Sequence, residues 1–599
     1  MRSARSYLLA LFGAGLAATA LVQPAQAADP VYTVQALHFA VKVGPANDEP
    51  CSIVGDLYLP KSASSTKKVP AILTTNGFGG SKSDQAGLGR TFASRGYAVL
   101  SYSGLGFGGS GCKITLDDPD WDGKAASQLV SYLGGKTGIA FTDAAHTTPA
   151  KKLSVIRLDT TNQLGVKVPN DPRVGMVGGS YGGQIQFAAA SVDPRIDTII
   201  PIITWSDLSY SLSPNNTSQT SGVQTSTPGA AKLTWALGFT GLGIANGLQN
   251  AQVDPSRLIP CPNFATFVCP ALVTAGVLGT VDASTTANLR HASVSSYFKK
   301  IKIPTLIIQG QSDTLFNINE GVANYQALQK QGTPTKMIWF NGGHSGPAAP
   351  GELNIGNPNP ATEHLSMSIA NWFDHYLKGS SVSTGPEFSY FRNWVKYTGI
   401  ATPAYGTATS YPVGTATKYY LSGTKLTTSS AGITAGTQSF LTPPAGPPTS
   451  TDPTDVAALP LPEIDLPGTS ASWSTPPLTS ATNVVGQPKL TIKVNAALAE
   501  ATQTAGPYGS LVLFVKIADV DATGKATIIR NLVAPVRVPD ASKPFTITLP
   551  GIVHQFAKGH TLKLIVAGGS TNYRGGLIPN AVTITTGAAG QVLTLPIVK

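Results

Sequence analysis

A single serine stands among glycines in the segment 176–183, which reads Met-Val-Gly-Gly-Ser-Tyr-Gly-Gly. Residues 178–182 fit the pattern Gly-x-Ser-x-Gly, in which a serine at a sharp strand-to-helix turn exposes its hydroxyl. An apolar segment that favours a strand precedes Ser180, and a segment of helical character follows it. Because the chain has 63 glycines in 599 residues, a chance match would not be surprising, so the interpretation depends on partner residues. With suitable partners, Ser180 is predicted to be a nucleophile.

A serine hydroxyl needs a base to become nucleophilic, and the base needs an acid to orient it. In this type of site the acid and then the histidine follow the serine along the chain. Asp313 follows the apolar segment 303–310, and His344 follows the next one, 335–340. None of the other histidines stands just past an expected strand end: these are His38, His146, His291, His364, His375, His554 and His560. The sequence therefore predicts a relay of Ser180, His344 and Asp313 that carries out acyl transfer.

Acyl transfer also needs donors for the oxyanion that forms when the serine attacks. The residue after the nucleophile supplies one backbone N–H, which here is that of Tyr181. The second donor is expected from the loop after an early strand. Segment 74–82, Thr-Thr-Asn-Gly-Phe-Gly-Gly-Ser-Lys, fits that place, and its donor would be the backbone N–H of Phe78. The alternative is an ordinary glycine turn.

Strands and helices are expected to alternate around these residues. Near-continuous apolar strands separated by helices occur from residue 51 to residue 375, a pattern typical of a buried parallel sheet with helices on its faces. The pattern stops between residues 206 and 300, a segment rich in Ser, Thr, Gly, Ala and Leu that is expected to form an inserted cap. After residue 378 short strands with alternating hydrophobicity predict an all-β sandwich or jelly roll.

These segments divide the chain as follows: residues 1–27 are a signal peptide, 28–205 and 301–380 form one α/β domain, 206–300 form the cap, and 381–599 form the β domain. The leader has two arginines, an apolar run and the small residues Ala-Gln-Ala before its expected cleavage site. A membrane anchor is the alternative, but the apolar run is short for one. The sequence thus predicts a secreted protein without a transmembrane segment.

Four cysteines in an exported chain predict two disulfides, for which three pairings are possible. Cys261 and Cys269 are close enough in sequence to close a short loop, and Cys51 and Cys112 would then pair by elimination. Zinc is the alternative, but no Cys-x-x-Cys or His-x-x-x-His spacing supports it.

Acidic residues gather before an expected helix at Asp117, Asp118, Asp120 and Asp122. Calcium binding is one interpretation of this cluster. We favour the other, in which acids at a helix N-terminus complement the helix dipole. The net charge of +11 comes from scattered lysines and arginines, which argues against a nucleic-acid partner. No metal or cofactor is expected.

The chain resembles the family of X-prolyl dipeptidyl peptidases and cocaine esterase. The resemblance rests on the motifs Gly-Gly-Ser-Tyr-Gly-Gly-Gln, 303–316 and Gly-Gly-His-Ser, together with segments of the β domain such as 513–525. It implies an α/β-hydrolase with an inserted cap and a C-terminal jelly roll, and it implies Ser180, Asp313 and His344 as the catalytic residues. Cocaine esterase uses a tyrosine hydroxyl as an oxyanion donor, whereas this chain has Phe78 at the matching position.

The resemblance implies a small-molecule ester or a short X-Pro peptide as the substrate. A dipeptidyl peptidase needs a carboxylate for the free ammonium of its substrate, and Asp207 is the best-placed acid in the cap. Asp207 could instead cap a helix. Trp205 is expected beside it in an apolar site. An acyltransferase and a non-catalytic surface-binding protein that uses its β domain are the remaining alternatives.

Overall fold

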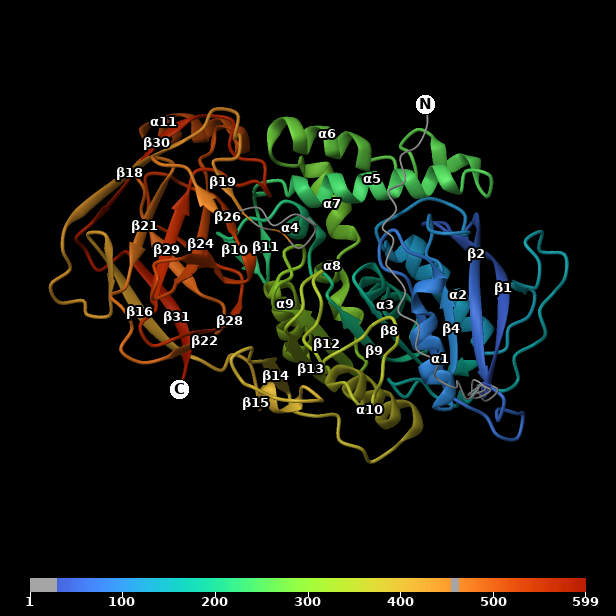
Figure 1. Ribbon diagram of the computed structural model, residues 1–599. Helices are drawn as coiled ribbons and strands as arrows, with labels where there is room; N and C mark the ends of the chain where they lie inside the picture. The colour runs from blue at the N-terminus through green and yellow to red at the C-terminus, as the bar shows by residue number, and fades with distance from the viewer. Residues whose placement is uncertain (1–29, 453, 455–462) are drawn as a thin grey trace, which may run out of the picture.

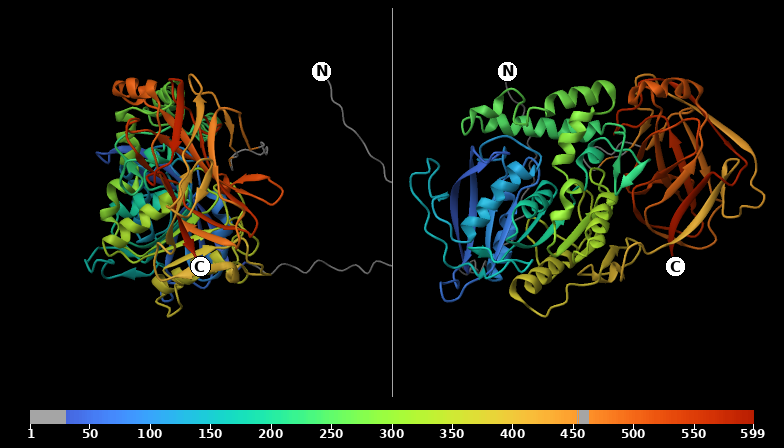
Figure 2. Two further views of the ribbon diagram at one scale, coloured as in Figure 1. Left: turned by 90° about the vertical axis from the view of Figure 1, so that its left-hand side faces the viewer. Right: turned by 180° about the vertical axis from the view of Figure 1, so that it is seen from behind.

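The computed structural model describes residues 30–599 except 453 and 455–462, so the expected signal peptide lies outside the described residues. The chain forms an α/β domain and an all-β domain that lie side by side, with helices of the cap along one edge of the pair (Figures 1 and 2). None of the helices in the described part of the chain combines the length and hydropathy that a membrane span requires.

The α/β domain is built on an eleven-stranded sheet with the order β15-β14-β13-β12-β9-β8-β3-β4-β2-β1-β5. The strands from β4 to β14 in this order run parallel, and the strands at both edges are antiparallel. The bounds are β1 Tyr32–Val43, β2 Glu49–Pro60, β3 Ala71–Thr75, β4 Ala98–Tyr102, β5 Ala140–Phe141, β8 Val174–Gly179, β9 Ile196–Ile202, β12 Thr305–Gly310, β13 Thr335–Phe340, β14 Phe388–Phe391 and β15 Tyr405–Ala408. Strands β3, β4, β8, β9 and β12 are buried along their whole length, which explains their continuous apolar sequences.

Helices cover both faces of this sheet. Side chains of α2, α3 and α9 belong to one hydrophobic core, and those of α1 and α10 belong to another on the opposite face. Their bounds are α1 Ala86–Ser94, α2 Lys124–Leu133, α3 Tyr181–Val192, α9 Ile318–Lys330 and α10 His364–Lys378. Two short pairs, β6 (Leu158–Asp159) with β7 (Asp171–Pro172) and β10 (Gln219–Ser221) with β11 (Gln224–Thr225), stand apart from the sheet.

The cap is inserted between β9 and β12 and is mainly helical. It comprises α4 (Leu208–Leu212), α5 (Leu233–Gln249), α6 (Val268–Leu278), α7 (Ala283–His291) and α8 (Val294–Tyr297). The apolar helices α5 and α6 lie across one end of the molecule in Figure 1. The structure contains the Cys261–Cys269 disulfide within the cap and the Cys51–Cys112 disulfide between β2 and the loop after β4.

Two strands that follow the predicted boundary at residue 381 pair with the sheet of the α/β domain. Strands β14 and β15 complete the first sheet, and the second sheet starts at β16. A four-residue strand that is buried on both faces, such as β14, shows no alternation, which is why the sequence pattern did not reveal it.

The second sheet comprises twelve strands. Its bounds are β16 Thr415–Ser422, β17 Lys425–Thr427, β21 Ser470–Ser474, β22 Thr482–Gly486, β23 Lys489–Ile492, β24 Val512–Val520, β25 Ala526–Ile528, β26 Ala534–Arg537, β27 Phe545–Thr548, β28 Ile552–Phe556, β29 Thr561–Ala567 and β31 Val592–Val598. Two smaller pairs flank it, β18 (Gly436–Thr442) with β30 (Asn580–Thr586) and β19 (Ser450–Thr451) with β20 (Ile464–Asp465). The short helix α11 (Ala497–Thr502) also belongs to this domain, which has a hydrophobic core of its own.

Candidate active site

Ser180 occupies the turn between β8 and α3. Its backbone has φ 57° and ψ −120°, a conformation that non-glycine residues rarely adopt and that costs about 1–3 kcal/mol. The turn is tightly packed, because a Cβ on Gly178 would lie 2.6 Å from the carbonyl oxygen of Gly182, and a Cβ on Gly182 would lie 2.5 Å from that of Thr75. The glycines around Ser180 are therefore needed for close packing of the turn, and the strained serine presents its hydroxyl at the end of the sheet.

Ser180, His344 and Asp313 lie within hydrogen-bonding distance of one another in series. The Oγ of Ser180 is 2.8 Å from Nε2 of His344, and Nδ1 of His344 is 3.1 Å from Oδ2 of Asp313. The three residues follow β8, β13 and β12, whose carboxyl ends meet at one edge of the parallel sheet. This arrangement can remove a proton from the serine while the carboxylate stabilises the imidazolium that forms.

The carboxylate of Asp313 is fully buried and fixed by its own loop. Its Oδ1 accepts hydrogen bonds from the backbone N–H groups of Leu315 at 2.9 Å and Phe316 at 2.7 Å, which leaves Oδ2 to face His344. The imidazole of His344 makes edge-to-face contacts with two aromatic rings. Its ring centroid lies 5.1 Å from that of Phe316 and 5.2 Å from that of Trp235. Trp235 comes from α5 of the cap, so the cap contacts the histidine directly, and no local pattern in the sequence indicated this.

The segments that carry the two predicted oxyanion donors lie next to the serine. Tyr181 is the first residue of α3, where a backbone N–H has no acceptor within the helix and lies at the positive end of the helix dipole. The loop after β3 passes the nucleophile closely, because a Cβ on Gly77 would lie 3.9 Å from the Cβ of Ser180. The residue before Phe78 thus lies beside the serine, and the role of the Phe78 N–H stays a prediction.

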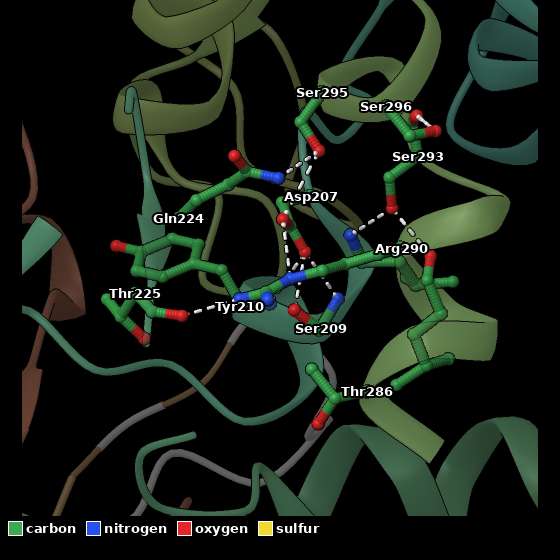
Figure 3. Close-up of polar contacts among 12 residues, drawn as sticks. Asp207, Ser209, Tyr210, Gln224, Thr225, Thr286, Arg290, Ser293, Ser295 and Ser296 are labelled. Carbon is green, nitrogen blue, oxygen red and sulfur yellow. Dashed lines mark hydrogen bonds and ion pairs between the residues drawn. The ribbon is translucent and has the colours of Figure 1, made fainter. Parts of the chain in front are cut away.

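Asp207, the predicted ammonium ligand, is not among the residues that line the pocket at Ser180. It is fully buried and is the N-cap of α4, where Oδ1 accepts from the backbone N–H of Ser209 at 3.0 Å. Oδ2 faces the Oγ of Ser295 at 3.2 Å and Nε of Arg290 at 3.4 Å, as Figure 3 shows. The structure thus gives Asp207 the capping role that was the alternative, and its carboxylate is enclosed by internal partners.

Trp205 contributes to a large apolar pocket at Ser180. The pocket has an empty volume of about 930 Å³, including the space at its open mouth. It is lined by Phe78, Leu116, Ser180, Tyr181, Trp205, Leu208, Leu212, Ala231, Ala236, Phe239, Thr240, Phe264, Phe267, Val268, Ala271, Leu272, Ala275, Val281, Thr285, Leu289 and Phe316. None of these lining residues carries a carboxylate, imidazole, thiol, amine or guanidinium group, so the pocket suits an uncharged ligand.

The acidic cluster is divided between two environments. Asp118 is the N-cap of the turn 119–123, and together with Asp120 it lies 3.4 Å from Nε2 of His291. Asp117 and Asp122 are buried instead, and burial raises the pKa of Asp122 to about 7. The cap at Asp118 agrees with the interpretation we favoured for this cluster.

The β domain reaches the loops that carry the relay. Arg530, in the turn 529–531, donates through Nη1 to Oδ1 of Asn341 at 2.9 Å and through Nη2 to Oε1 of Gln311 at 3.0 Å. These two residues belong to the loops that bear His344 and Asp313. Burial lowers the pKa of Arg530 to about 10, which keeps the guanidinium charged at neutral pH.

Comparison with protein families agrees with this site. Residues 49–258 match the model described as X-Pro dipeptidyl-peptidase (S15 family), and residues 386–595 match that of the X-Pro dipeptidyl-peptidase C-terminal non-catalytic domain. Residues 264–354, which include Asp313 and His344, match a model described as serine hydrolase (FSH1). The fold and site define a serine hydrolase with an α/β-hydrolase domain. Within this class the chain belongs to the X-Pro dipeptidyl-peptidase family S15, which confirms the resemblance seen in the sequence.

Solved structures share the fold over nearly the whole chain. An aminopeptidase from the marine sediment archaeon Thaumarchaeota archaeon has a TM-score of 0.60 at 13% identity, and the match covers 97% of this chain and 99% of that one. An α-amino acid ester hydrolase has a TM-score of 0.59 at 16% identity, with coverage of 97% and 100%. A CocE/NonD family hydrolase from Staphylococcus aureus has a TM-score of 0.56 at 13% identity, with coverage of 95% and 99%. Comparison with curated protein sequences gave no match.

Proposed function

We propose that this protein is a secreted serine hydrolase that cleaves, through an acyl-enzyme, esters whose acyl group carries no charge. The observation that carries the proposal is the relay of Ser180, His344 and Asp313 at the edge of an uncharged pocket. In the first step Oγ of Ser180 attacks the ester carbonyl, and its proton passes to Nε2 of His344. The imidazolium then gives this proton to the leaving alcohol. Water attacks the acyl-enzyme with His344 as base, which releases the acid and restores the serine.

The backbone N–H groups of Tyr181 and Phe78 would stabilise the oxyanion in both steps. Removal of one such donor typically lowers kcat by about 10²–10³-fold in serine hydrolases. Asp313 would hold the imidazole in the tautomer that accepts a proton at Nε2. The two hydrogen bonds from its own loop to Oδ1 support this role, because they leave Oδ2 in a fixed position.

Cleavage of an X-Pro amide is the second candidate function, and the family match favours it. It requires a carboxylate at the pocket for the substrate ammonium, because an unpaired charge is costly to bury. The enclosed position of Asp207 and the uncharged lining of the pocket favour the ester instead. Secretion is supported by the leader-like sequence of residues 1–27 and by two disulfides.

The test compares p-nitrophenyl butyrate with Ala-Pro p-nitroanilide on the mature wild-type protein. We expect turnover of the ester and a value of kcat/KM for the anilide that is lower by at least about 10²-fold, the loss typical of an unpaired charge in a pocket. Efficient anilide cleavage would reject the ester preference in favour of the peptidase. A lack of activity on both substrates, with no labelling by a fluorophosphonate, would reject the hydrolase itself.

A further inference from the structure

We propose that the pocket beside Ser180 is a binding site for an extended acyl chain, and that the substrates are esters of medium- and long-chain unbranched carboxylic acids. This inference rests on the proposed function, since the chain must be attached to the carbonyl that Ser180 attacks. It adds the class of the acid and the place where the chain lies.

The pocket is lined by residues of four cap helices, α4, α5, α6 and α7. On α6 its lining residues are Val268, Ala271, Leu272 and Ala275, which lie on one face at helical spacing. The rise of an α-helix makes this stretch about 10 Å long. Ser180 and Tyr181 line the same pocket, but Tyr181 belongs to a different hydrophobic cluster from Ala275. The cavity therefore extends from the nucleophile to a distinct apolar region under the cap.

Small side chains form the end that is remote from the aromatic cluster. Ala231, Ala275 and Val281 pack together there, whereas Phe78, Phe239 and Phe264 surround the region near Tyr181. The rings of Phe78 and Phe239 are 4.9 Å apart, and those of Phe78 and Phe264 are 6.1 Å apart. A flexible chain can pass beside aromatic side chains and fill the region beyond them, which a compact acid such as acetate would leave empty.

Three polar side chains of the lining already have backbone partners. The hydroxyl of Tyr181 accepts from the backbone N–H of Asp117 at 3.0 Å. Nε1 of Trp205 donates to the backbone carbonyl of Ala292 at 3.1 Å. The hydroxyl of Thr240 donates to the backbone carbonyl of Ala236 at 2.7 Å. They therefore do not depend on a polar ligand. This leaves an apolar surface along which methylene groups can pack.

The nearest buried acids do not turn this site into an ammonium site. Asp207 is enclosed by its own partners, and Asp117, the residue after the lining residue Leu116, is fully buried. Burial, with the neighbouring Asp122, raises the pKa of Asp117 well above its ordinary value. Neither Asp117 nor Asp207 is among the residues that line the pocket, so an acyl group that carries an α-ammonium would have no carboxylate partner there.

The first experiment measures kcat/KM for p-nitrophenyl acetate, butyrate, octanoate and decanoate below their aggregation limits. Each buried methylene should raise kcat/KM about fourfold until the pocket is full. We therefore expect octanoate to exceed acetate by at least about 100-fold. A value that is constant or falls beyond butyrate would overturn the acyl-chain site while leaving the hydrolase intact. Inactivity on every ester would instead reject the proposed function.

The second experiment shortens the pocket. Ala275→Phe places a ring at its small-residue end, and Ala271→Phe does so on the same helix at a position that is only half-buried. Val273→Phe is the matched control, because Val273 is 65% exposed on the outer face of α6. We expect at least one pocket variant to lower the ratio of octanoate to acetate kcat/KM by 10-fold or more, and we expect Val273→Phe to keep the wild-type ratio. Equal octanoate preference in folded pocket variants and the control would contradict the proposal.

The third experiment uses a pair of substrates on the wild-type protein to separate the effect of the acyl chain from the effect of an ammonium charge. The p-nitrophenyl esters of hexanoic acid and of norleucine share one carbon skeleton, and norleucine adds an α-ammonium. At a pH that keeps the amine protonated, we expect kcat/KM to be at least about 100-fold higher for the hexanoate. Equal rates, or faster norleucine release, would show that the site recognises an amino acid.

Discussion

The guanidinium of Arg530, in the β domain, donates a hydrogen bond of 2.9 Å to Oδ1 of Asn341, three residues before His344. A second bond, of 3.0 Å, reaches Oε1 of Gln311, two residues before Asp313. One half-buried side chain therefore ties together the two loops that position the base and its acid. Arg530 has φ 56°, a strained value that the surrounding contacts must maintain.

Replacement of Arg530 should therefore impair catalysis more than substrate binding. We expect Arg530→Ala to lower kcat about 10–100-fold with little change in KM, because a displacement of about 1 Å in a catalytic group can cost 10²-fold. Arg530→Lys should recover part of the loss. The measurement is the separate determination of kcat and KM, with a melting curve for each variant.

Arg537 provides the matched control for this prediction. It is also an arginine of the β domain and is buried, but it donates to the carbonyl oxygens of Pro228 and Gly229 at 3.1 Å, away from the catalytic loops. Arg537→Ala should lower stability and leave kcat of the folded protein within about threefold of wild type. Equal losses of kcat in the two alanine variants would mean that Arg530 acts only through domain packing.

Asp207→Asn should affect stability and not substrate selectivity. The carboxylate caps α4 and faces Arg290. The amide can still cap the helix, but it loses the charge opposite Arg290, which should cost about 1–2 kcal/mol. The ratio of ester to anilide cleavage should stay unchanged, because Asp207 is fully buried among its internal partners. Chemical denaturation and both assays on the variant check this. Selective loss of anilide cleavage would restore Asp207 as a ligand for the substrate.

Glu320 should make the protein less stable as the pH rises. Burial raises its pKa from 4.5 to about 7, although the hydroxyl of Ser211 and the backbone N–H groups of Ser206 and Asp207 partly oppose the shift. The folded state thus holds the proton more tightly than the unfolded state. Glu320 makes its full contribution to the free energy of unfolding below about pH 4.5. This contribution, roughly 3 kcal/mol, is lost as the pH rises through about 7.

The test compares the free energy of unfolding of wild type and Glu320→Gln at pH 5 and pH 8. Because the variant cannot ionise at this position, the decrease between the two pH values should be smaller for it than for wild type. An identical decrease in the two proteins would show that Glu320 does not titrate in this range.

The two disulfides should differ in their effect on stability. Cys51 and Cys112 are 61 residues apart, whereas Cys261 and Cys269 are 8 apart. In the chain-entropy model the bridge that closes the longer loop lowers the entropy of the unfolded chain more. It should therefore stabilise the folded state by about 2 kcal/mol more than the short bridge. Paired Cys→Ser variants of each bridge should therefore show the larger loss of stability for the Cys51–Cys112 bridge, as measured by melting temperature. The opposite order would show that the short bridge acts through the folded cap.

The sequence could predict the relay because each member follows a buried strand, and parallel strands bring their carboxyl ends to one edge. It could not decide the role of Asp207, because a capping acid and a substrate ligand have the same local sequence. Trp235 and Arg530 reach the site from the cap and from the β domain. Their contacts depend on tertiary packing between segments far apart in the chain, so no local pattern marks them.

The most direct test of the whole account is to trap the acyl-enzyme. The mature protein is mixed with p-nitrophenyl octanoate, quenched in acid within the first turnover and digested, and the peptides are analysed by mass spectrometry. The account predicts an octanoyl group on Ser180 in the wild type, and neither adduct nor ester turnover above about 10⁻³ of wild type in Ser180→Ala. An octanoyl group on another residue, or substantial turnover by Ser180→Ala, would contradict it.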